Sequence, residues 1–264
     1  MLIICNGAFK SGSSWLHAIL VELAIVKKIN IKKTPAKYTN DINSPTTIIE
    51  SQLQEFIDAE NFLVNNYLTK AHFFKQSTLE KSYFDNVKFL FIERDIRDAI
   101  VSHYYHVNNK YRFDISFFLY YSLLGRYKAY EIGLFNNRCK QYMGEDNFFN
   151  YADLITNFSD TIKKVAKVIE IDNLSVRDIM RVKEQTSLVK LREGLKRGDL
   201  RYYPSKKNDN WKLFRKGEVG GWKKYFSGNQ LTDIESISKG KFSRLSKIIY
   251  FFVFTLRRIV FKVE

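Results

Sequence analysis

The stretch NGAFKSGSSWL, from Asn6 to Leu16, follows a short apolar run that begins at Leu2. It fits most of the frame of a phosphate-binding loop, G-x-x-x-x-G-K-[ST], in which backbone amides hold an anion. Ser13 stands where that frame has its lysine, and a lysine stands instead at Lys10, two residues ahead of the second glycine. The stretch therefore predicts a strand, an anion-binding loop and a helix, with the cation of the loop moved toward its first glycine.

The segments that surround this loop alternate between two patterns. Short apolar runs typical of buried parallel strands occupy residues 2–6, 66–71, 87–93 and 148–151. Helical periodicity covers residues 14–26, 47–60, 113–138 and 153–169. Asp95 is placed to cap a further helix, and residues 30–47 read as a surface connection. The alternation predicts an α/β domain with a three-layer, P-loop-like fold, in which helices flank a central parallel β-sheet and ligands bind beyond the carboxyl ends of the strands.

The composition favours an anionic partner but does not identify it. The chain has 264 residues and a formal charge of +15, but it is also rich in lysine, isoleucine and asparagine, so part of this charge is compositional bias. The only cysteines, Cys5 and Cys139, offer no disulfide framework and no metal-ligand spacing. No export signal is recognised at the N-terminus. These features predict a cytoplasmic protein.

One domain is expected over residues 1–240, followed by a basic and apolar C-terminal helix over residues 241–264. The apolar centre of this segment, Ile248 to Phe254, is too short to span a membrane and is flanked by cations. Large apolar helix faces are usually buried, which favours packing on the domain or on a second copy. Peripheral contact with the inner face of a membrane is the alternative. The sequence does not predict the oligomeric state.

Two further stretches combine cations with features that suit a bound anion. In RDIRDAIVSHYYH, Arg94 follows a predicted strand and Ser102 lies two helical turns on, so a guanidinium and a hydroxyl can reach one phosphate. In RKGEVGGWKKYF, which begins at Arg215, the glycines permit close approach of the backbone to an anion.

In this order, FKSGSSWL, RDIRDAIVSHYYH and RKGEVGGWKKYF resemble the donor-binding motifs of the sulfotransferases that use 3′-phosphoadenosine 5′-phosphosulfate (PAPS). The resemblance implies that the loop residues bind the 5′-phosphosulfate: Lys10, Ser11, Gly12, Ser13 and Ser14. It implies that the 3′-phosphate is held by Arg94, Ser102, Arg215, Lys216 and the backbone at Gly217. Shorter matches imply that adenine is bound near Trp15, Tyr151, Thr186 and Leu188. The chain departs from the pattern at Gly221, where the family has an aspartate.

A fourth stretch, LTKAHFF, resembles the family segment K-T-H-[LF]. The resemblance implies that His72 is the general base, which takes the proton of an acceptor hydroxyl, and that Lys70 adds positive charge near the transferred group. Lys10 would stabilise the charge that develops on the leaving phosphate. The implied reaction is in-line transfer of the sulfuryl group from PAPS, with 3′-phosphoadenosine 5′-phosphate (PAP) as product and no metal ion.

The acceptor is not predicted beyond a hydroxylated small molecule, carbohydrate or lipid. Its pocket is expected to involve residues 30–60, 106–130 and 194–214, which carry many aromatic side chains and no motif. The histidines outside LTKAHFF, namely His17, His103 and His106, are interpreted as structural or peripheral.

Two other functions are alternatives. A degenerate P-loop kinase or ATPase would need a lysine near Ser13 and a carboxylate for magnesium, for which Glu93 is the one candidate. A basic protein that binds nucleic acid or a membrane surface without catalysis would account for the charge. However, no recognition helix, RNP-like strand or zinc spacing is present in the sequence, so nucleic acid is not an expected partner.

Overall fold

Five parallel strands form the central sheet of the computed structural model, in the order β2-β3-β1-β4-β5. The structure describes residues 1–39, 47–83, 85–112, 114–197, 214–244 and 246–252. The strands are β1 (Leu2–Gly7), β2 (Ile31–Lys32), β3 (Asn66–Ala71), β4 (Val87–Glu93) and β5 (Phe148–Asn150). This arrangement confirms the predicted α/β fold with its central parallel sheet.

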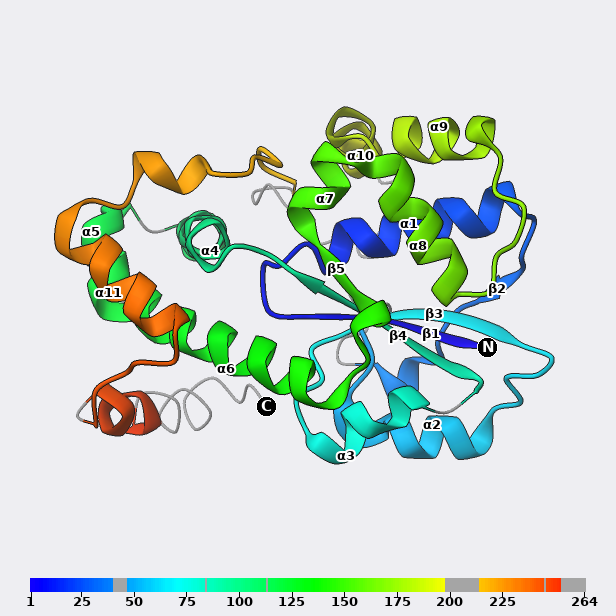
Figure 1. Ribbon diagram of the computed structural model, residues 1–264, viewed down its shortest axis with the longest axis horizontal. Coiled ribbons are helices and arrows are strands. Elements are labelled where there is room, and N and C mark those ends of the chain that lie inside the picture. Colours follow the sequence, from blue (N-terminus) through cyan, green and yellow to red (C-terminus); the bar gives the residue numbers. More distant parts are fainter. Residues whose placement is uncertain (40–46, 84, 113, 198–213, 245, 253–264) are drawn as a thin grey trace.

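Helices cover both faces of the sheet, which gives three layers (Figure 1). The helices of one face are α1 (Ser13–Val26), α7 (Tyr151–Thr156), α8 (Phe158–Val168), α9 (Val176–Gln185) and α10 (Leu188–Lys196). The others are α2 (Leu53–Ala59), α3 (Gln76–Leu79), α4 (Ile96–Tyr111), α5 (Phe117–Tyr120), α6 (Arg126–Tyr142) and α11 (Gly228–Ser238).

Side-chain alternation along β1 explains the two layers of core. Successive residues of a strand point to opposite faces of the sheet. Leu2 and Ile4 belong to the core shared with α2, α4 and α6, whereas Ile3 and Cys5 belong to the core shared with α1, α8 and α9. All four side chains are nearly or fully inaccessible to solvent. The apolar run therefore predicts a strand that is buried on both faces, as observed.

Strand register places the candidate site at one edge of the sheet. Asn6 of β1 pairs with Ala71 of β3, and Gly7 pairs with Ile92 of β4. The loop after β1 is thereby flanked by His72 on one side and by the end of β4 on the other. Sites in α/β sheets lie at the carboxyl ends of the strands, and the three predicted motifs meet at this edge.

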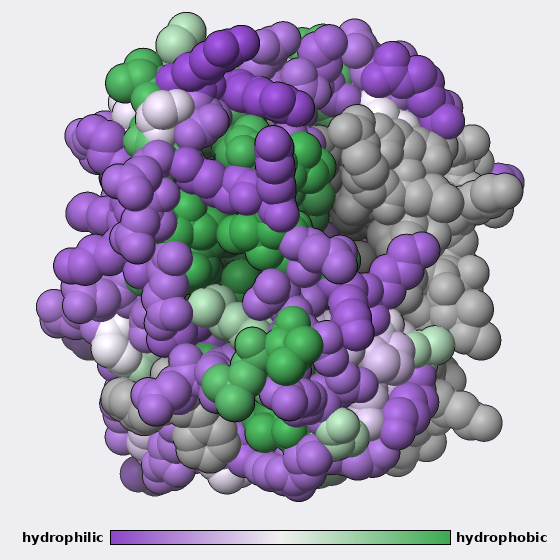
Figure 2. Space-filling view, turned by 90° about the vertical axis from the view of Figure 1, so that its right-hand side faces the viewer, coloured by the Kyte–Doolittle hydropathy of each residue, from purple (hydrophilic) through white to green (hydrophobic). Residues whose placement is uncertain are grey.

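The opposite edge of the sheet holds the amino ends of the strands. It belongs to the side of the molecule that faces the viewer in Figure 2, where hydrophobic side chains gather in a hollow bordered by hydrophilic residues. A pocket of about 750 Å³ at this edge is lined by residues 57–63 and 85–87. Because these residues precede β3 or lie at the start of β4, the pocket lies away from the anion-binding loop.

Three predicted boundaries are corrected by the structure. The helix predicted over residues 153–169 is divided at Asn157, whose φ of −135° and ψ of 54° are not helical. Tyr151 begins α7 instead of ending a strand, because Asn150 caps this helix by accepting from Ala152 N at 2.8 Å. The helix predicted from residue 47 begins only at Leu53, after a 3₁₀ turn.

Two further elements differ from the prediction. The edge strand β2 lies within the predicted surface connection, and its two residues are too few for a periodic pattern. The helix predicted over residues 113–138 is formed by α5, a π-helical turn from Tyr121 to Gly125, and α6. Because π-helical turns are rare and occur mostly within α-helices, the sequence pattern alone predicts one continuous helix.

The described part of the C-terminal segment contacts α6. Phe242 stacks on Tyr130 with ring centroids 4.3 Å apart, and Tyr250 meets the same ring at 5.5 Å. Ile248 and Phe251 are exposed. The rest of the predicted segment, residues 253–264, lies outside the described residues. Within the part of the chain that the structure describes, no helix is long and apolar enough to cross a membrane.

Candidate active site

Two glycines shape the loop between β1 and α1. A Cβ atom at Gly7 would lie 2.5 Å from Ser11 Oγ, and one at Gly12 would lie 2.5 Å from Tyr151 Cδ2. Gly12 and Lys10 both have left-handed backbone conformations, with φ of 107° and 68°. Such a conformation is strained for lysine, and strain of this kind clusters at ligand sites. No side chain caps α1, so its N-terminal amides and the positive end of its dipole suit a bound anion.

Positive charge is concentrated at this loop by four side chains from different segments: Lys10, Lys70, Arg94 and Arg215. Burial, followed by the charges of the other three cations, lowers the pKa of Lys10 to about 8. Lys70 is buried beside Cys5 on the neighbouring strand, and burial lowers its pKa to about 8 as well, with a smaller opposite effect of Cys5. These four positive charges repel one another, and a multiply charged anion would relieve that repulsion.

Three polar atoms around the loop are buried and have no hydrogen-bond partner within the described ranges: Arg94 Nε, Arg215 Nε and Ser11 Oγ. A buried polar group without a partner costs about 1–3 kcal/mol, so such groups usually face a ligand or water. Both guanidinium groups are fixed by aromatic rings. The Cζ atom of Arg94 lies 4.3 Å from the ring centre of Tyr151, and that of Arg215 lies 4.2 Å from the ring centre of Tyr105.

His72 lies beside the loop in one defined tautomer. Its Nδ1 is 2.7 Å from the carbonyl oxygen of Gly7, and since a carbonyl only accepts, Nδ1 carries the proton and Nε2 is basic. Solvent reaches the side chain, but protein surrounds it closely enough that desolvation lowers its pKa to about 4. Lys70 and Lys128 lower the pKa further, whereas the Gly7 hydrogen bond and Glu131 oppose this shift. The imidazole is therefore neutral at pH 7 and can accept a proton.

The residues predicted near adenine come together on the other side of the loop. Trp15 Nε1 donates to the Thr186 carbonyl at 2.9 Å, and the Trp15 ring meets that of Tyr151 at 5.4 Å. A Cβ atom at Gly217 would lie 3.6 Å from Tyr151 Oη and 3.9 Å from Leu188 Cδ2. The Thr186 hydroxyl donates to a carbonyl one turn back in its own helix, so the backbone of this residue, not its side chain, orients Trp15.

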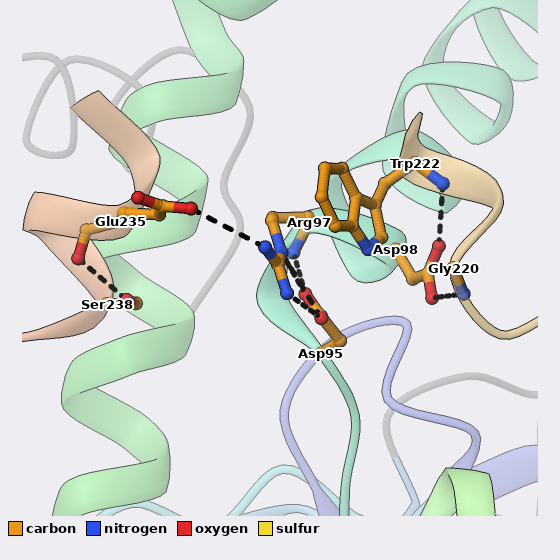
Figure 3. Close-up of polar contacts among 7 residues, drawn as sticks. All are labelled: Asp95, Arg97, Asp98, Gly220, Trp222, Glu235 and Ser238. Atoms are coloured by element: carbon orange, nitrogen blue, oxygen red, sulfur yellow. Dashed lines mark hydrogen bonds and ion pairs between the residues drawn. The ribbon is translucent and has the colours of Figure 1, made fainter. Parts of the chain in front are cut away.

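Asp98 fixes the third motif to the start of α4 (Figure 3). One of its oxygens accepts from Gly220 N at 2.8 Å and the other accepts from Trp222 N at 3.0 Å. The Trp222 ring lies against the Arg97 guanidinium, with Cζ 3.8 Å from the ring centre, and Arg97 also reaches Glu235 on α11 at 3.7 Å. These contacts bring a distant segment to the end of β4.

Gly221 suits its surroundings better than the aspartate of the family pattern would. A Cβ atom there would lie 3.0 Å from Glu218 Oε2 and 3.8 Å from Asp98 Oδ1, so an aspartate would add a third carboxylate beside two others. The Glu218 carbonyl accepts from Arg94 Nη2 at 2.9 Å, and its carboxylate is 3.9 Å from Lys216 Nζ. Lys216 is exposed and therefore less engaged with the loop than Arg215.

The structure gives less support to two residues that the sequence suggests as ligands, Ser102 for the 3′-phosphate and Glu93 for a metal ion. Ser102 is half-buried on α4, and Arg94 directs a hydrogen bond to Glu218 and not to it. Glu93, the metal carboxylate that a kinase would need, forms an ion pair with Lys140 at 2.6 Å. Over the described ranges, no group of three or more His, Cys, Asp or Glu side chains is placed to hold a metal ion.

The structure adds residues to the site that the sequence interpretation missed. The ring of Phe9 lies 5.9 Å from that of His72, 5.6 Å from that of His103 and 5.4 Å from that of His106. His103 and His106 are three residues apart and so share one face of α4. That spacing is visible in the sequence, but only the fold shows that this face turns toward Phe9, whose ring also borders His72. The interpretation of His106 as structural or peripheral stays a prediction.

Comparison with known proteins identifies the family. The family model of the sulfotransferase domain matches residues 2–246. Two proteins of Flaveria bidentis, a flavonol sulfotransferase-like protein and a flavonol 3-sulfotransferase, are each 23% identical to the chain. The matches cover 94% and 86% of this chain, and 83% and 77% of the two relatives.

Solved structures show the same fold. A mouse sulfotransferase complexed with PAP superposes with a TM-score of 0.65 at 17% identity, covering 97% of this chain and 88% of that one. Retinol dehydratase in complex with androsterone and PAP gives a TM-score of 0.63 at 17% identity, covering 92% of this chain and 81% of that one. The match of the family over nearly the whole chain carries the assignment, and the chain therefore belongs to the sulfotransferase family.

Proposed function

We propose that the protein transfers the sulfuryl group of PAPS to an acceptor hydroxyl by in-line displacement. The observation that carries this proposal is the set of four cations at the loop, among which two arginines have buried Nε atoms without a partner in the described residues. PAP carries phosphates at two positions, which suits a site that has two lysines, Lys10 and Lys70, and two arginines, Arg94 and Arg215. The mouse sulfotransferase and retinol dehydratase structures were determined with PAP, which supports the same donor here.

The reacting groups have defined tasks in this proposal. The acceptor oxygen gives its proton to Nε2 of His72 and forms a bond to sulfur, while the bond from sulfur to the 5′-phosphate oxygen breaks. Negative charge develops on that phosphate oxygen, where the Lys10 ammonium and the amides of the loop from Ser11 to Ser14 stabilise it. Lys70, which is buried on β3, adds positive charge near the transferred group. Charge balances because His72 takes the proton and the departing PAP carries the electron pair of the broken bond. The imidazolium then releases the proton to solvent, since the pKa of His72 is about 4.

The nucleotide would be held at three places. Arg94 and Arg215, with Ser102, Lys216 and the backbone at Gly217, bind the 3′-phosphate. Adenine lies against Trp15 and Tyr151, near Thr186 and Leu188. The contacts of Asp98 with Gly220 and Trp222 keep the third motif close enough to take part.

Both cysteines fit a reducing compartment. Cys5 and Cys139 are buried and form no disulfide, and free buried thiols are typical of intracellular proteins. We therefore place the reaction in the cytoplasm.

The donor is tested by calorimetric titration with PAP, 5′-AMP and ATP with magnesium. Wild type is expected to prefer PAP, and Arg94→Ala is expected to weaken PAP binding about 10- to 100-fold, because charge-assisted hydrogen bonds are worth about 1.5–3 kcal/mol. Binding of 5′-AMP should be unchanged in the variant. Arg177→Ala, an exposed arginine at the start of α9, serves as the control. Equal affinity for PAP and 5′-AMP, or preference for ATP with magnesium, would contradict the proposal.

The pH dependence of kcat/KM is expected to follow His72 and Lys10. The base is active when neutral, so the rate rises with pH through about 4, the pKa of His72, and not through the ordinary histidine value. The Lys10 cation is lost above about 8, so the rate falls there. Bound PAPS stabilises this cation, and the alkaline limb of kcat should therefore lie at higher pH than that of kcat/KM. An acid limb near 6.5 would show that His72 is not desolvated as described.

A further inference from the structure

Beside His72, polar side chains surround the aromatic ring of Phe9. Phe9 directly precedes Lys10 in the chain and its ring lies beside that of His72. An acceptor whose hydroxyl reaches both reacting groups must therefore pass close to Phe9. The Nζ atom of Lys128, on α6, is 5.1 Å from the centre of this ring.

The groups around Phe9 offer hydrogen bonds without a large net charge. Lys128 is buried and its Nζ lies 2.7 Å from Glu131 Oε1, so the charges of this pair largely cancel. His103 Nδ1 lies 2.5 Å from Tyr120 Oη. His106 is half-buried next to them, and burial, followed by Lys10, Lys110 and Lys128, lowers its pKa to about 3. A neutral imidazole offers one donor and one acceptor, which matches a hydroxyl.

We infer that the acceptor is a polyhydroxylated molecule of the carbohydrate class, which lays one face on Phe9 and directs a hydroxyl next to the reacting one to His106. This inference rests on the proposed function. Stacking on an aromatic ring combined with hydrogen bonds from side chains at its rim suits a sugar, which has apolar faces and polar edges. His106 is a specificity-determining residue in this arrangement. The ion pair of Lys128 and Glu131 forms another polar part of the surroundings of Phe9.

A wholly apolar alcohol suits the polar side chains around Phe9 less well. To dock there it would remove water from His106 and from the ion pair of Lys128 and Glu131 without replacing the lost hydrogen bonds, and sites with buried polar groups discriminate strongly against ligands that lack a matching group. The retinol dehydratase structures hold androsterone and retinol. The polar groups around Phe9 suit a polyhydroxylated acceptor better than they suit such apolar alcohols.

The test compares two classes of acceptor with PAPS as donor and PAP release as readout. One class contains the methyl glycosides and β-linked disaccharides of glucose and galactose, and the other contains 2-naphthol and androsterone. The highest kcat/KM is expected for a glycoside. A higher value for 2-naphthol or androsterone than for every glycoside overturns the inference, and so does the absence of turnover with all glycosides.

Variants of His106 separate recognition from folding. His106→Leu is expected to lower kcat/KM for the best glycoside about 10-fold through KM, with little change for 2-naphthol, because about 1.4 kcal/mol is lost with one hydrogen bond. His106→Gln keeps a donor and an acceptor and should restore most of this loss. An equal decrease for both acceptor classes contradicts the role of His106.

PAP affinity, measured for the wild type and each variant, separates failure of the acceptor inference from failure of the proposed function. Retained PAP binding with a preference for apolar alcohols overturns the acceptor class alone. If the wild type does not bind PAP, the proposed function itself is overturned.

Discussion

Replacing Lys10 with methionine lowers kcat for sulfuryl transfer about 10²- to 10³-fold, the effect typical of removing one group that stabilises developing negative charge. The ammonium of Lys10 lies at the loop beside the expected position of the oxygen that bridges phosphate and sulfate. Charge grows on this oxygen only as the bond breaks. The variant should therefore lose more in kcat than in PAP affinity, since interactions that strengthen in the transition state act on the rate.

The matched control for this variant is Lys163→Met. Lys163 is exposed on α8 and pairs with Asp160 at 3.4 Å, with both side chains more than half accessible, and exposed pairs of this kind contribute little to stability. Its kcat should equal that of wild type. If Lys10→Met binds PAP as wild type does and also turns over at an undiminished rate, another group stabilises the leaving phosphate, and Lys70 would be the next candidate.

The position of Lys10 illustrates what the sequence predicts well. The apolar run from Leu2, the two glycines of the loop and the periodicity of the following helix are local signals, and the structure confirms each of them. Local signals also predict β3 and β4 with their observed limits. Parallel pairing of these strands then brings the ends of all three together, because the carboxyl ends of parallel strands meet at one edge.

Features that depend on contacts between distant segments were not predicted. The hydrogen bonds from Asp98 to Gly220 and Trp222 join residues with more than a hundred others between them. The ring contacts of Phe9 with His103 and His106 depend on how α4 is rotated about its axis. The break at Asn157, whose backbone is not helical, interrupts an apolar periodicity that continues across it in the sequence. In each case tertiary packing decides among local structures of similar free energy.

The second large effect is expected for His72→Ala, which should lower kcat about 10²- to 10⁴-fold, as loss of a general base does. The imidazole has its basic Nε2 directed away from the Gly7 carbonyl, which binds Nδ1 at 2.7 Å. Without it, a weakly acidic hydroxyl must lose its proton to water while it attacks sulfur. Unchanged PAP affinity in the variant would show that the nucleotide site is intact.

A change of acceptor separates loss of the base from a general disturbance of the site. 4-Nitrophenol is ionised to a substantial extent near neutral pH, and its anion needs no base, whereas phenol stays almost entirely protonated. Both can be slow acceptors, because only the ratio of variant to wild-type rate matters for each. His72→Ala should slow phenol severely and 4-nitrophenol much less, and the limb near pH 4 should disappear from its profile. Equal slowing of both acceptors would mean that His72 positions the acceptor without removing its proton, and the basic nitrogen would then have to be sought at His106, whose ring also borders Phe9.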